Sequence, residues 1–464
     1  LPQAEISSNA FLNKVGINGF YTLEDAFVVR SEENNIDYIE QSGYKDNIRQ
    51  AFADFLDKDI TEIPQYNPED SLIKNLPYNK DIEDIKPNVI VIIMESFGAD
   101  LIKYQSEEFN ILGELKKHFD EDLVFMNFVP GHHVTIGSIE AVTTNIARKP
   151  MSPYLSQSKY IYQKYQFSGP RPYKAKGYES IFIYGGNMGW RGLEPFMLSL
   201  GFDEVLGDGA MDSKYPRNQW GIFDEYLFQY VYEALDSGEQ SKFITVMTIT
   251  NHPPFSLPQN YKPGSLIAPQ SLNERIQNKE LAQKRFETYQ YANEAVGQFI
   301  SKIKNSKYAD NTIIVVTGDH NFWGLFQYLT QELFDSISVP FYLYIPPKLK
   351  PSNIDTAIVG SHLDILPTVY SVSLSSISYM AMGSNLLSKD AQNHIASHDS
   401  GIIFDKTDIV QYDFQNGNAA YFVWSQNSPR EVLPSEERDG HKRLLKRFLS
   451  QTAISDYLIK YAGE

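Results

Sequence analysis

The sequence predicts an α/β fold with a mostly parallel central sheet flanked by helices, followed by a small antiparallel subdomain. Residues 88–94 form an apolar, β-branched run without polar alternation, which is typical of a strand covered on both faces. Similar runs recur with helix-like stretches between them, and this alternation favours parallel strands. After about residue 385, short strand-like segments joined by turns replace that pattern, which indicates a separate antiparallel unit.

The expected elements divide the chain into three parts. Residues 1–86 carry helical patches and a stretch rich in Pro and Asn, and we expect an arm that leads into the main domain. Residues 87–385 form the expected α/β domain, with further strands at 123–129, 180–184, 243–250, 312–317 and 339–345 and helices at 221–235 and 273–303. Residues 386–464 form the expected subdomain, with strands at 400–404, 409–414 and 419–424 and a closing helix over 434–461.

The composition narrows the classes of function. The 464 residues include 41 Lys and Arg against 58 Asp and Glu, a net charge of −17, and no basic cluster interrupts this balance. We therefore expect no nucleic acid partner. The absence of cysteine excludes disulfides, thiolate nucleophiles and cysteine zinc sites, so catalysis would use oxygen or nitrogen groups. No run approaches the ~18 apolar residues of a membrane span, and we expect a soluble piece of a longer protein.

Chemically active side chains follow several of the expected strands. The residues that come after a strand-like run are Glu95, His252, Asp319 and His320. Because the carboxyl ends of parallel strands meet at one edge of a sheet, we expect these side chains to lie close together. Carboxylates gathered there would repel one another unless a cation neutralised them. We therefore expect one divalent metal. Carboxylate and imidazole ligands favour Zn²⁺ or Mn²⁺ over Ca²⁺, and Mg²⁺ stays open.

Thr135 is the candidate nucleophile. Its hydroxyl lies at the apparent start of a helix, where free backbone N–H groups favour an anion. A bound metal would help to stabilise its alkoxide. The alternative is that Thr135 only caps this helix, and the local sequence leaves both interpretations open.

Seven motifs occur in the order of a known family. The set resembles the sulfatase-like branch of the alkaline phosphatase superfamily, and within it the extracytoplasmic domain of lipoteichoic acid synthases and phosphoglycerol transferases. The motifs are residues 88–98, His133-Val-Thr135-Ile-Gly137, Gly186-Asn187-Met-Gly-Trp190-Arg191, Trp220-Gly221-Ile-Phe-Asp224, Thr250-Asn-His252-Pro-Pro-Phe255, Gly318-Asp-His320 and Gly360-Ser-His362-Leu-Asp364. The stretch Asn18-Gly19-Phe20-Tyr21 with Ala26-Phe27 also resembles the segment that links membrane helices to the catalytic domain in those enzymes.

The resemblance implies roles for individual residues. The implied ligands of a single divalent metal are Glu95, Thr135, Asp319 and His320, with Thr135 as the nucleophile. His252 and His362 would bind the phosphoryl oxygens or assist the leaving group. Trp190 and Arg191 are the nearest matches to the tryptophan and arginine that hold glycerol phosphate in the synthases, although here they are adjacent and the spacing differs by about a residue.

The remaining histidines follow no such motif. The pair His132-His133 before Thr135 departs from the family pattern, and a polar loop and a ligand role both stay open. We expect the other four at the surface: His118, His394, His398 and His441.

The reaction that the resemblance implies is a phosphotransfer. Thr135 would attack the headgroup phosphodiester of a phospholipid, and a glycan or polyglycerol-phosphate acceptor would then displace the phospho-threonine. Membrane helices before Leu1 would hold the domain at the extracytoplasmic face of a bacterial membrane. Sulfate ester hydrolysis is not expected, because Thr stands where sulfatases proper have the Cys or Ser that becomes formylglycine. Two alternatives remain: a phosphoesterase of the same fold that uses water, and a non-catalytic domain that binds anions.

Overall fold

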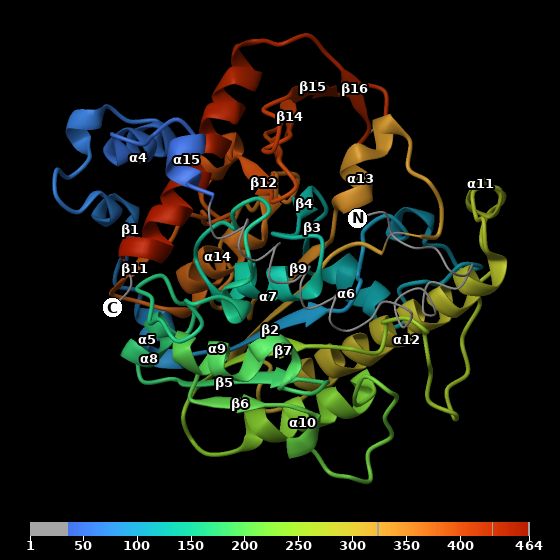
Figure 1. Ribbon diagram of the computed structural model, residues 1–464. Helices are drawn as coiled ribbons and strands as arrows, with labels where there is room; N and C mark the ends of the chain where they lie inside the picture. Colours follow the sequence, from blue (N-terminus) through green and yellow to red (C-terminus); the bar gives the residue numbers. More distant parts are fainter. Residues whose placement is uncertain (1–35, 323, 429, 463–464) are drawn as a thin grey trace, which may run out of the picture.

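The centre of the molecule is a seven-stranded sheet. The computed structural model in Figure 1 describes residues 36–322, 324–428 and 430–462. The strand order is β3-β9-β8-β2-β7-β5-β6. The strands are β2 (Asn88–Met94), β3 (Leu123–Phe125), β5 (Glu179–Tyr184), β6 (Glu204–Leu206), β7 (Lys242–Met247), β8 (Thr312–Gly318) and β9 (Phe341–Tyr344). Five neighbouring strands are parallel, whereas β9 runs antiparallel to both β8 and β3. The predicted fold class, a mostly parallel α/β sheet, is confirmed.

Strand β2 lies between β7 and β8 and is buried over its full length. Val89, Val91 and Ile93 pack into one hydrophobic core, and Ile90 and Ile92 pack into the other. This split follows from the period-two geometry of a strand, which points successive side chains to opposite faces. An uninterrupted apolar sequence is therefore what a central strand needs.

Helices cover both faces of the sheet (Figure 1). The core on one face includes side chains from α6 (Leu115–Glu121), α10 (Asp224–Asp236) and α12 (Lys279–Lys304). The core on the other face includes side chains from α7 (Thr135–Thr143), α8 (Arg171–Ala175), α9 (Leu193–Leu200) and α14 (Ile365–Ser373). Two short helices complete this region: α11 (Gln270–Asn273) and α13 (Leu333–Ile337).

The expected single strand at residues 123–129 is wrong. The chain leaves the main sheet after β3, and β4 (Phe128–Val129) pairs in parallel with β10 (Gly360–Ser361). Asn127 accounts for the change: its backbone carbonyl accepts a hydrogen bond from the N–H of Gly360, and its side chain donates to the carbonyl of Ala357. These bonds pull the second half of the run toward β10.

The C-terminal part contains the expected antiparallel sheet. Its order is β12-β13-β14-β15-β16, with every neighbouring pair antiparallel. The strands are β12 (Ala396–His398), β13 (Ile402–Phe404), β14 (Asp408–Tyr412), β15 (Ala419–Trp424) and β16 (Val432–Pro434). The closing helix α15 (Asp439–Tyr461) starts later than expected, because residues 432–434 pair with β15.

The described N-terminal residues pack against the rest of the chain. Strand β1 (Ile73–Leu76) pairs antiparallel with β11 (Ile377–Met380), and α4 (Ile48–Leu56) lies beside α15 (Figure 1). The other helices here are α3 (Tyr38–Gln41) and α5 (Lys80–Ile85). The expected linker motifs at residues 18–21 and 26–27 lie outside the described residues. Domain limits at residues 86 and 385 stay a prediction. Within the described ranges, every helix is too short or too polar to cross a bilayer.

Candidate active site

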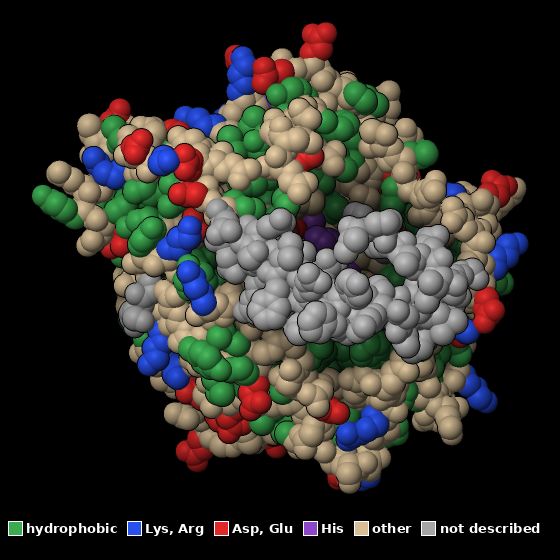
Figure 2. Space-filling view, in the orientation of Figure 1, with side chains coloured by type: hydrophobic (Ala, Val, Ile, Leu, Met, Phe, Trp, Pro, Cys, Tyr) green, Lys and Arg blue, Asp and Glu red, His purple; other side chains and the backbone are tan. Residues whose placement is uncertain are grey.

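Three predicted ligands meet at one edge of the central sheet. Glu95 follows β2, and Asp319 and His320 follow the neighbouring strand β8. One ligand atom from each lies within 4.8 Å of those of the other two. On the face shown in Figure 2, histidine side chains lie in a hollow. The parallel register of β2 and β8 brings these ends together, as the sequence predicts.

Only one of the two carboxylate oxygens of Asp319 accepts hydrogen bonds. Its Oδ1 accepts hydrogen bonds of 2.7 Å from the backbone N–H groups of Ser96 and His320. Its Oδ2 is buried and has no hydrogen-bond partner among the described residues. A fully buried carboxylate oxygen without a partner is costly unless it binds a cation. Asp319 therefore fits a metal ligand.

His320 is held in the tautomer that metal ligands require. Its Nδ1 donates to the backbone carbonyl of Asn321 at 2.8 Å, which leaves the lone pair on Nε2. The Nε2 atom lies 3.3 Å from Asp319 Oδ2 and 3.4 Å from Thr135 Oγ1. A lone pair, a free carboxylate oxygen and a hydroxyl thus face the same point.

Glu95 supplies a second buried carboxylate. Burial raises its pKa, and the nearby negative charge of Asp319 raises it further. The hydroxyl of Ser96 donates to Glu95 Oε1 at 2.9 Å, while Glu95 Oε2 faces Thr135. Two buried carboxylates this close together form a site that a divalent cation would neutralise.

Thr135 is the first residue of α7 and not its cap. The N-cap residue is Val134, and no side chain caps this helix end. Thr135 Oγ1 lies 3.4 Å from Glu95 Oε2 and 3.4 Å from His320 Nε2. The capping interpretation of Thr135 is therefore wrong. The hydroxyl therefore lies at the positive end of the helix dipole and beside the predicted ligands Glu95 and His320.

A buried arginine that no sequence motif indicates contacts the backbone beside Glu95. Arg285 of α12 is 1% exposed and donates to the backbone carbonyl of Ser96 and to the side chain of Asn251. Asn251 in turn donates to the backbone carbonyl of Glu95 at 3.0 Å. Arg285 lies on the same side of the predicted helix as its apolar residues, and no motif in the sequence marks it as a functional residue.

His252 lies beside the exposed ring of Trp220. The two ring centroids are 4.2 Å apart, and both His252 Nδ1 and Trp220 Nε1 donate to the carbonyl of Pro253. The Nδ1 bond leaves Nε2 of His252 as the free nitrogen. Within the described residues, no hydrogen bond joins His252 to the Glu95, Thr135, Asp319 and His320 group, so its role toward phosphate stays a prediction.

His362 forms the core hydrogen bond that the sequence-based hypothesis did not expect. It is 1% exposed, and its Nε2 donates to the carbonyl of Gly318 at 2.9 Å. Burial lowers the pKa of His362 to about 3. The ring therefore stays neutral and supports the end of β8 next to Asp319. The buried Nδ1 has no partner among the described residues, and contact with a phosphoryl group stays a prediction.

Trp190 and Arg191 lie apart from the ligand group. Arg191 is exposed and donates to Gln157 at 2.9 Å, with its guanidinium 5.4 Å from the ring centroid of Tyr154. Trp190 packs near Tyr184, the last residue of β5. Among the described residues, no hydrogen bond, ion pair or ring contact joins either residue to the predicted metal ligands, so their substrate role stays a prediction.

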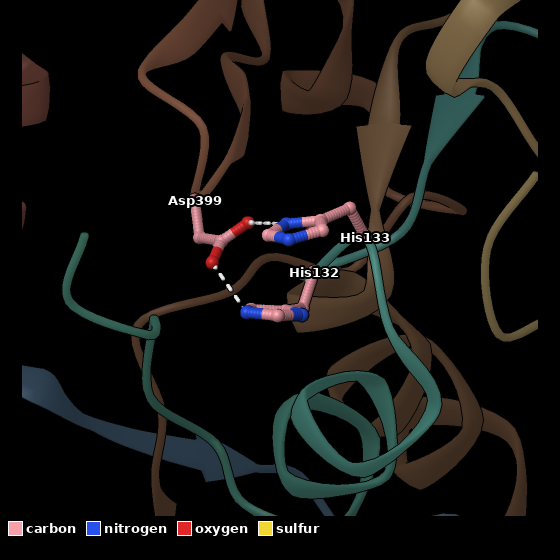
Figure 3. Close-up of side chains that lie close together, drawn as sticks. All are labelled: His132, His133 and Asp399. Atoms are coloured by element: carbon pink, nitrogen blue, oxygen red, sulfur yellow. Dashed lines mark ion pairs between the residues drawn. The ribbon is translucent and has the colours of Figure 1, made fainter. Parts of the chain in front are cut away.

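The second histidine cluster positions the segment before Thr135. Figure 3 shows Asp399 facing the stacked rings of His132 and His133. Val134 N–H donates to His132 Nδ1 at 2.9 Å, so His132 Nε2 carries the proton and donates to Asp399 Oδ2 at 2.9 Å. Burial alone would raise the pKa of Asp399, but its bonds to both rings outweigh this and hold it well below the usual range. A neutral His132 has no lone pair left for a metal.

Two further contacts fix this segment. A Cβ on Gly137 would lie 2.3 Å from the ring of His132, so only glycine fits there. The Ser138 hydroxyl lies within hydrogen-bond distance of the carbonyl oxygens of both His132 and Asp319. The segment before Thr135 is thus tied to the strand end that carries two predicted ligands.

The expectation that four histidines lie at the surface is wrong. His118, His398 and His441 are at most 2% exposed, and the side chain of His394 is 8% exposed. His118 bonds to Gly297 and Ser301, and His441 bonds to the carbonyl of Phe422. A histidine can fill a buried position when both elements around it supply polar partners, and a single sequence does not show those partners.

Comparison of the chain with known proteins identifies its family. Residues 87–373, more than half of the chain, match the sulfatase family model. The chain belongs to the sulfatase family. It is 25% identical over 424 residues to lipoteichoic acid synthase 1 of Bacillus subtilis (strain 168), which covers 86% of the chain and 61% of that protein. It is 24% identical over 331 residues to phosphoglycerol transferase I of Escherichia coli (strain SMS-3-5 / SECEC), which covers 68% of the chain and 41% of that protein.

Solved structures show the same fold. The lipoteichoic acid synthase LtaP from Listeria monocytogenes has a TM-score of 0.68 at 19% identity, covering 83% of this chain and 96% of that one. A protein of the alkaline phosphatase superfamily from Vibrio parahaemolyticus has a TM-score of 0.70 at 19% identity, covering 93% and 98%. The resemblance inferred from the motifs is confirmed. The chain spans between about two fifths and three fifths of the two curated relatives named above.

Proposed function

We propose that this chain is the catalytic part of a metal-dependent transferase that moves a phosphoglycerol-type headgroup from a phospholipid to a glycan or polyglycerol-phosphate acceptor. The observation that carries the proposal is the Thr135 hydroxyl at the start of α7, 3.4 Å from both Glu95 and His320. The name of one relative, phosphoglycerol transferase I, supports the class of transferred group. The domain would act at the extracytoplasmic face of a bacterial membrane, held there by a preceding membrane region.

The proposed metal ligands are Glu95, Asp319, His320 and Thr135. A divalent cation held by these groups, Mn²⁺ or Zn²⁺ with Mg²⁺ as a further option, would stabilise the alkoxide of Thr135 and polarise the phosphoryl oxygens. The mixture of carboxylate, imidazole and hydroxyl donors fits these ions. The unpartnered Asp319 Oδ2 supports a cation at this point.

The proposed reaction has two displacements at phosphorus. Thr135 Oγ loses its proton and forms a bond to phosphorus, the bond from phosphorus to the diacylglycerol oxygen breaks, and that oxygen takes a proton. An acceptor hydroxyl then loses its proton and forms its bond to phosphorus, the bond to Thr135 Oγ breaks, and Thr135 Oγ regains a proton. His252, with a free Nε2, is the proposed group that gives and takes these protons. Trp190 and Arg191 are the proposed contacts to the glycerol phosphate.

The decisive experiment seeks the covalent intermediate. The purified chain is incubated with phosphatidylglycerol vesicles and Mn²⁺, quenched with acid and examined by intact-mass spectrometry. We expect a glycerophosphoryl adduct on wild type and Thr135→Ser, and none on Thr135→Ala, whose turnover falls on the order of 10³-fold or more. Thr330→Ala, at an exposed threonine, is the matched control. An adduct or full turnover in a folded Thr135→Ala protein would contradict the proposal.

Two further arms of the experiment test the donor and the acceptor. Replacing phosphatidylglycerol with phosphatidylethanolamine tests the donor headgroup. Adding a glucan or glycerol-based acceptor separates transfer from hydrolysis, because a transferase passes the headgroup to the added hydroxyl. Free glycerol phosphate as the only product, at every acceptor concentration, would favour the phosphoesterase alternative.

A further inference from the structure

A second polar pocket lies away from the candidate active site. Its volume is about 570 Å³. Its walls come from three regions that are distant in sequence: Lys74 of β1, Arg443 and Arg447 of α15, and the segment around Asn385. Figure 1 shows β1, β11 and α15 together on one side of the molecule. None of these residues belongs to the predicted metal site or to the segment before Thr135.

Arg447 presents unmatched donors to this pocket. Its guanidinium carbon lies 3.4 Å from the ring centroid of the buried Phe55, which holds the group in a stacked position. Among the described residues, no acceptor bonds to its N–H groups and no carboxylate lies within 4.0 Å. A guanidinium has five N–H donors in a fixed fork. Fixed donors without protein acceptors point to a ligand with several oxygens.

Lys74 adds a second positive charge that lacks a counter-ion. Its ammonium donates to the backbone carbonyl of Gly383, and no carboxylate among the described residues lies within 4.0 Å. The pKa of Lys74 is lowered to about 8, mainly by burial and also by the positive charge of Arg447, against the attraction of Asp364. Two cations that face one pocket without a carboxylate in contact destabilise each other. An anion between them would remove that cost.

The other charged groups around the pocket offset only part of this positive charge. Arg443 pairs with Asp405, and His394 Nε2 lies 2.9 Å from Asp364 Oδ2. Asp57 lines the pocket but is exposed and forms no ion pair among the described residues. The negative charge of Asp57 attracts Arg447, so Lys74, Arg447 and Asp57 together leave one net positive charge at the pocket, in a protein whose net charge is −17.

We propose that this pocket binds the phosphate group of a phosphate ester. The planar fork of Arg447 matches two phosphate oxygens, and Lys74 supplies the second charge that a phosphate dianion needs. The volume exceeds that of a phosphate alone, and the Ser384, Asn385 and Tyr379 side chains supply partners for the hydroxyl groups of an attached polyol. The site does not depend on the proposed transfer reaction.

The test measures anion binding without metal. Wild-type protein in EDTA is titrated by calorimetry with inorganic phosphate and, separately, with glycerol 3-phosphate. We expect saturable binding that Arg447→Gln and Lys74→Gln each weaken by about 10-fold or more, as loss of a charged hydrogen-bond partner does. Lys446→Gln is the matched control, because Lys446 is the neighbouring residue of α15 and pairs with Asp54 instead. This control should bind as wild type does.

The outcomes distinguish a site for a phosphate ester from a site for phosphate alone, and both from the absence of an anion site. Tighter binding of glycerol 3-phosphate than of phosphate supports a phosphate ester, and equal binding restricts the site to the phosphate group. The melting temperature of each variant shows that it is folded, and Lys74→Gln serves where Arg447→Gln is unstable. Undiminished binding in both folded variants, or no saturable binding by wild type, would overturn the proposal. Neither result depends on Thr135 or on a metal.

Discussion

Two clusters of histidine and carboxylate side chains lie close to Thr135, and only one has the electronic arrangement of a metal site. In the cluster of Glu95, Asp319 and His320, a carboxylate oxygen has no hydrogen-bond partner among the described residues, and an imidazole lone pair faces the Thr135 hydroxyl. In the cluster of His132, His133 and Asp399, one His132 nitrogen accepts from Val134 and the other donates to Asp399. Proximity of ligand-type residues is therefore a weaker indicator than the free lone pairs that they retain.

The difference also assigns the two clusters separate tasks. In the first cluster, Glu95 and His320 face the Thr135 hydroxyl. In the second cluster, His132 accepts a hydrogen bond from the backbone N–H of Val134, one residue before Thr135. A nucleophile needs both charge stabilisation and a fixed position. Variants of the two clusters should therefore fail in different ways.

Asp319→Asn should have the largest effect. The variant keeps the shape of the side chain but replaces a carboxylate with a weaker, neutral ligand, so we expect metal binding and turnover to be lost. The apolar strand β8 remains intact, and the melting temperature without metal should stay close to that of wild type. Elemental analysis after dialysis against Mn²⁺ or Zn²⁺ measures the bound metal. A variant that retains stoichiometric metal and activity would show that Asp319 is not a ligand.

His132→Phe should have an intermediate effect. Phenylalanine fills the space of the ring but cannot accept from Val134 or donate to Asp399, so Thr135 should lose its fixed position. We expect kcat to fall by about 10–100-fold while metal content stays at the wild-type level. His132→Asn, whose Oδ1 can replace the Nδ1 acceptor, should recover part of the rate. Loss of metal in His132→Phe would instead make the second cluster a metal site.

The sequence predicts the group of metal ligands because these residues directly follow strands that can be recognised from the sequence. Glu95 and Asp319 come directly after apolar runs, and parallel strands bring such positions to one edge. The role of Asp399 could not be predicted in this way, because a turn after β12 in a different sheet brings it to His132. The end of β3 before Asn127 and the burial of His441 also depend on partners outside the local sequence. Asn127 bonds to a residue more than 200 positions away, and His441 bonds to one 19 positions away.

His398 should give the smallest effect, a pH dependence of stability. It is 2% exposed, and burial lowers its pKa to about 4 from an ordinary value of 6.5. Between pH 6.5 and 4 the unfolded chain binds this proton and the folded chain does not, so the free energy of unfolding decreases as the pH falls. The slope from this group is at most about 1.4 kcal/mol per pH unit, and it vanishes above pH 6.5.

Urea unfolding at pH 7, 6 and 5 in EDTA, on wild type and His398→Gln, measures this contribution. Glutamine can still accept from Ser400, as His398 Nδ1 does at 3.2 Å, but it does not titrate. We therefore expect the stability difference between the two proteins to shift in favour of the variant by about 1 kcal/mol for each pH unit below 6.5. Parallel curves for the two proteins from pH 7 to 5 would mean that His398 takes up its proton over the same pH range in the folded and the unfolded chain. The buried Asp399 beside it would then pair with a charged imidazolium, and the second cluster would carry a charge that its hydrogen bonds to His132 do not indicate.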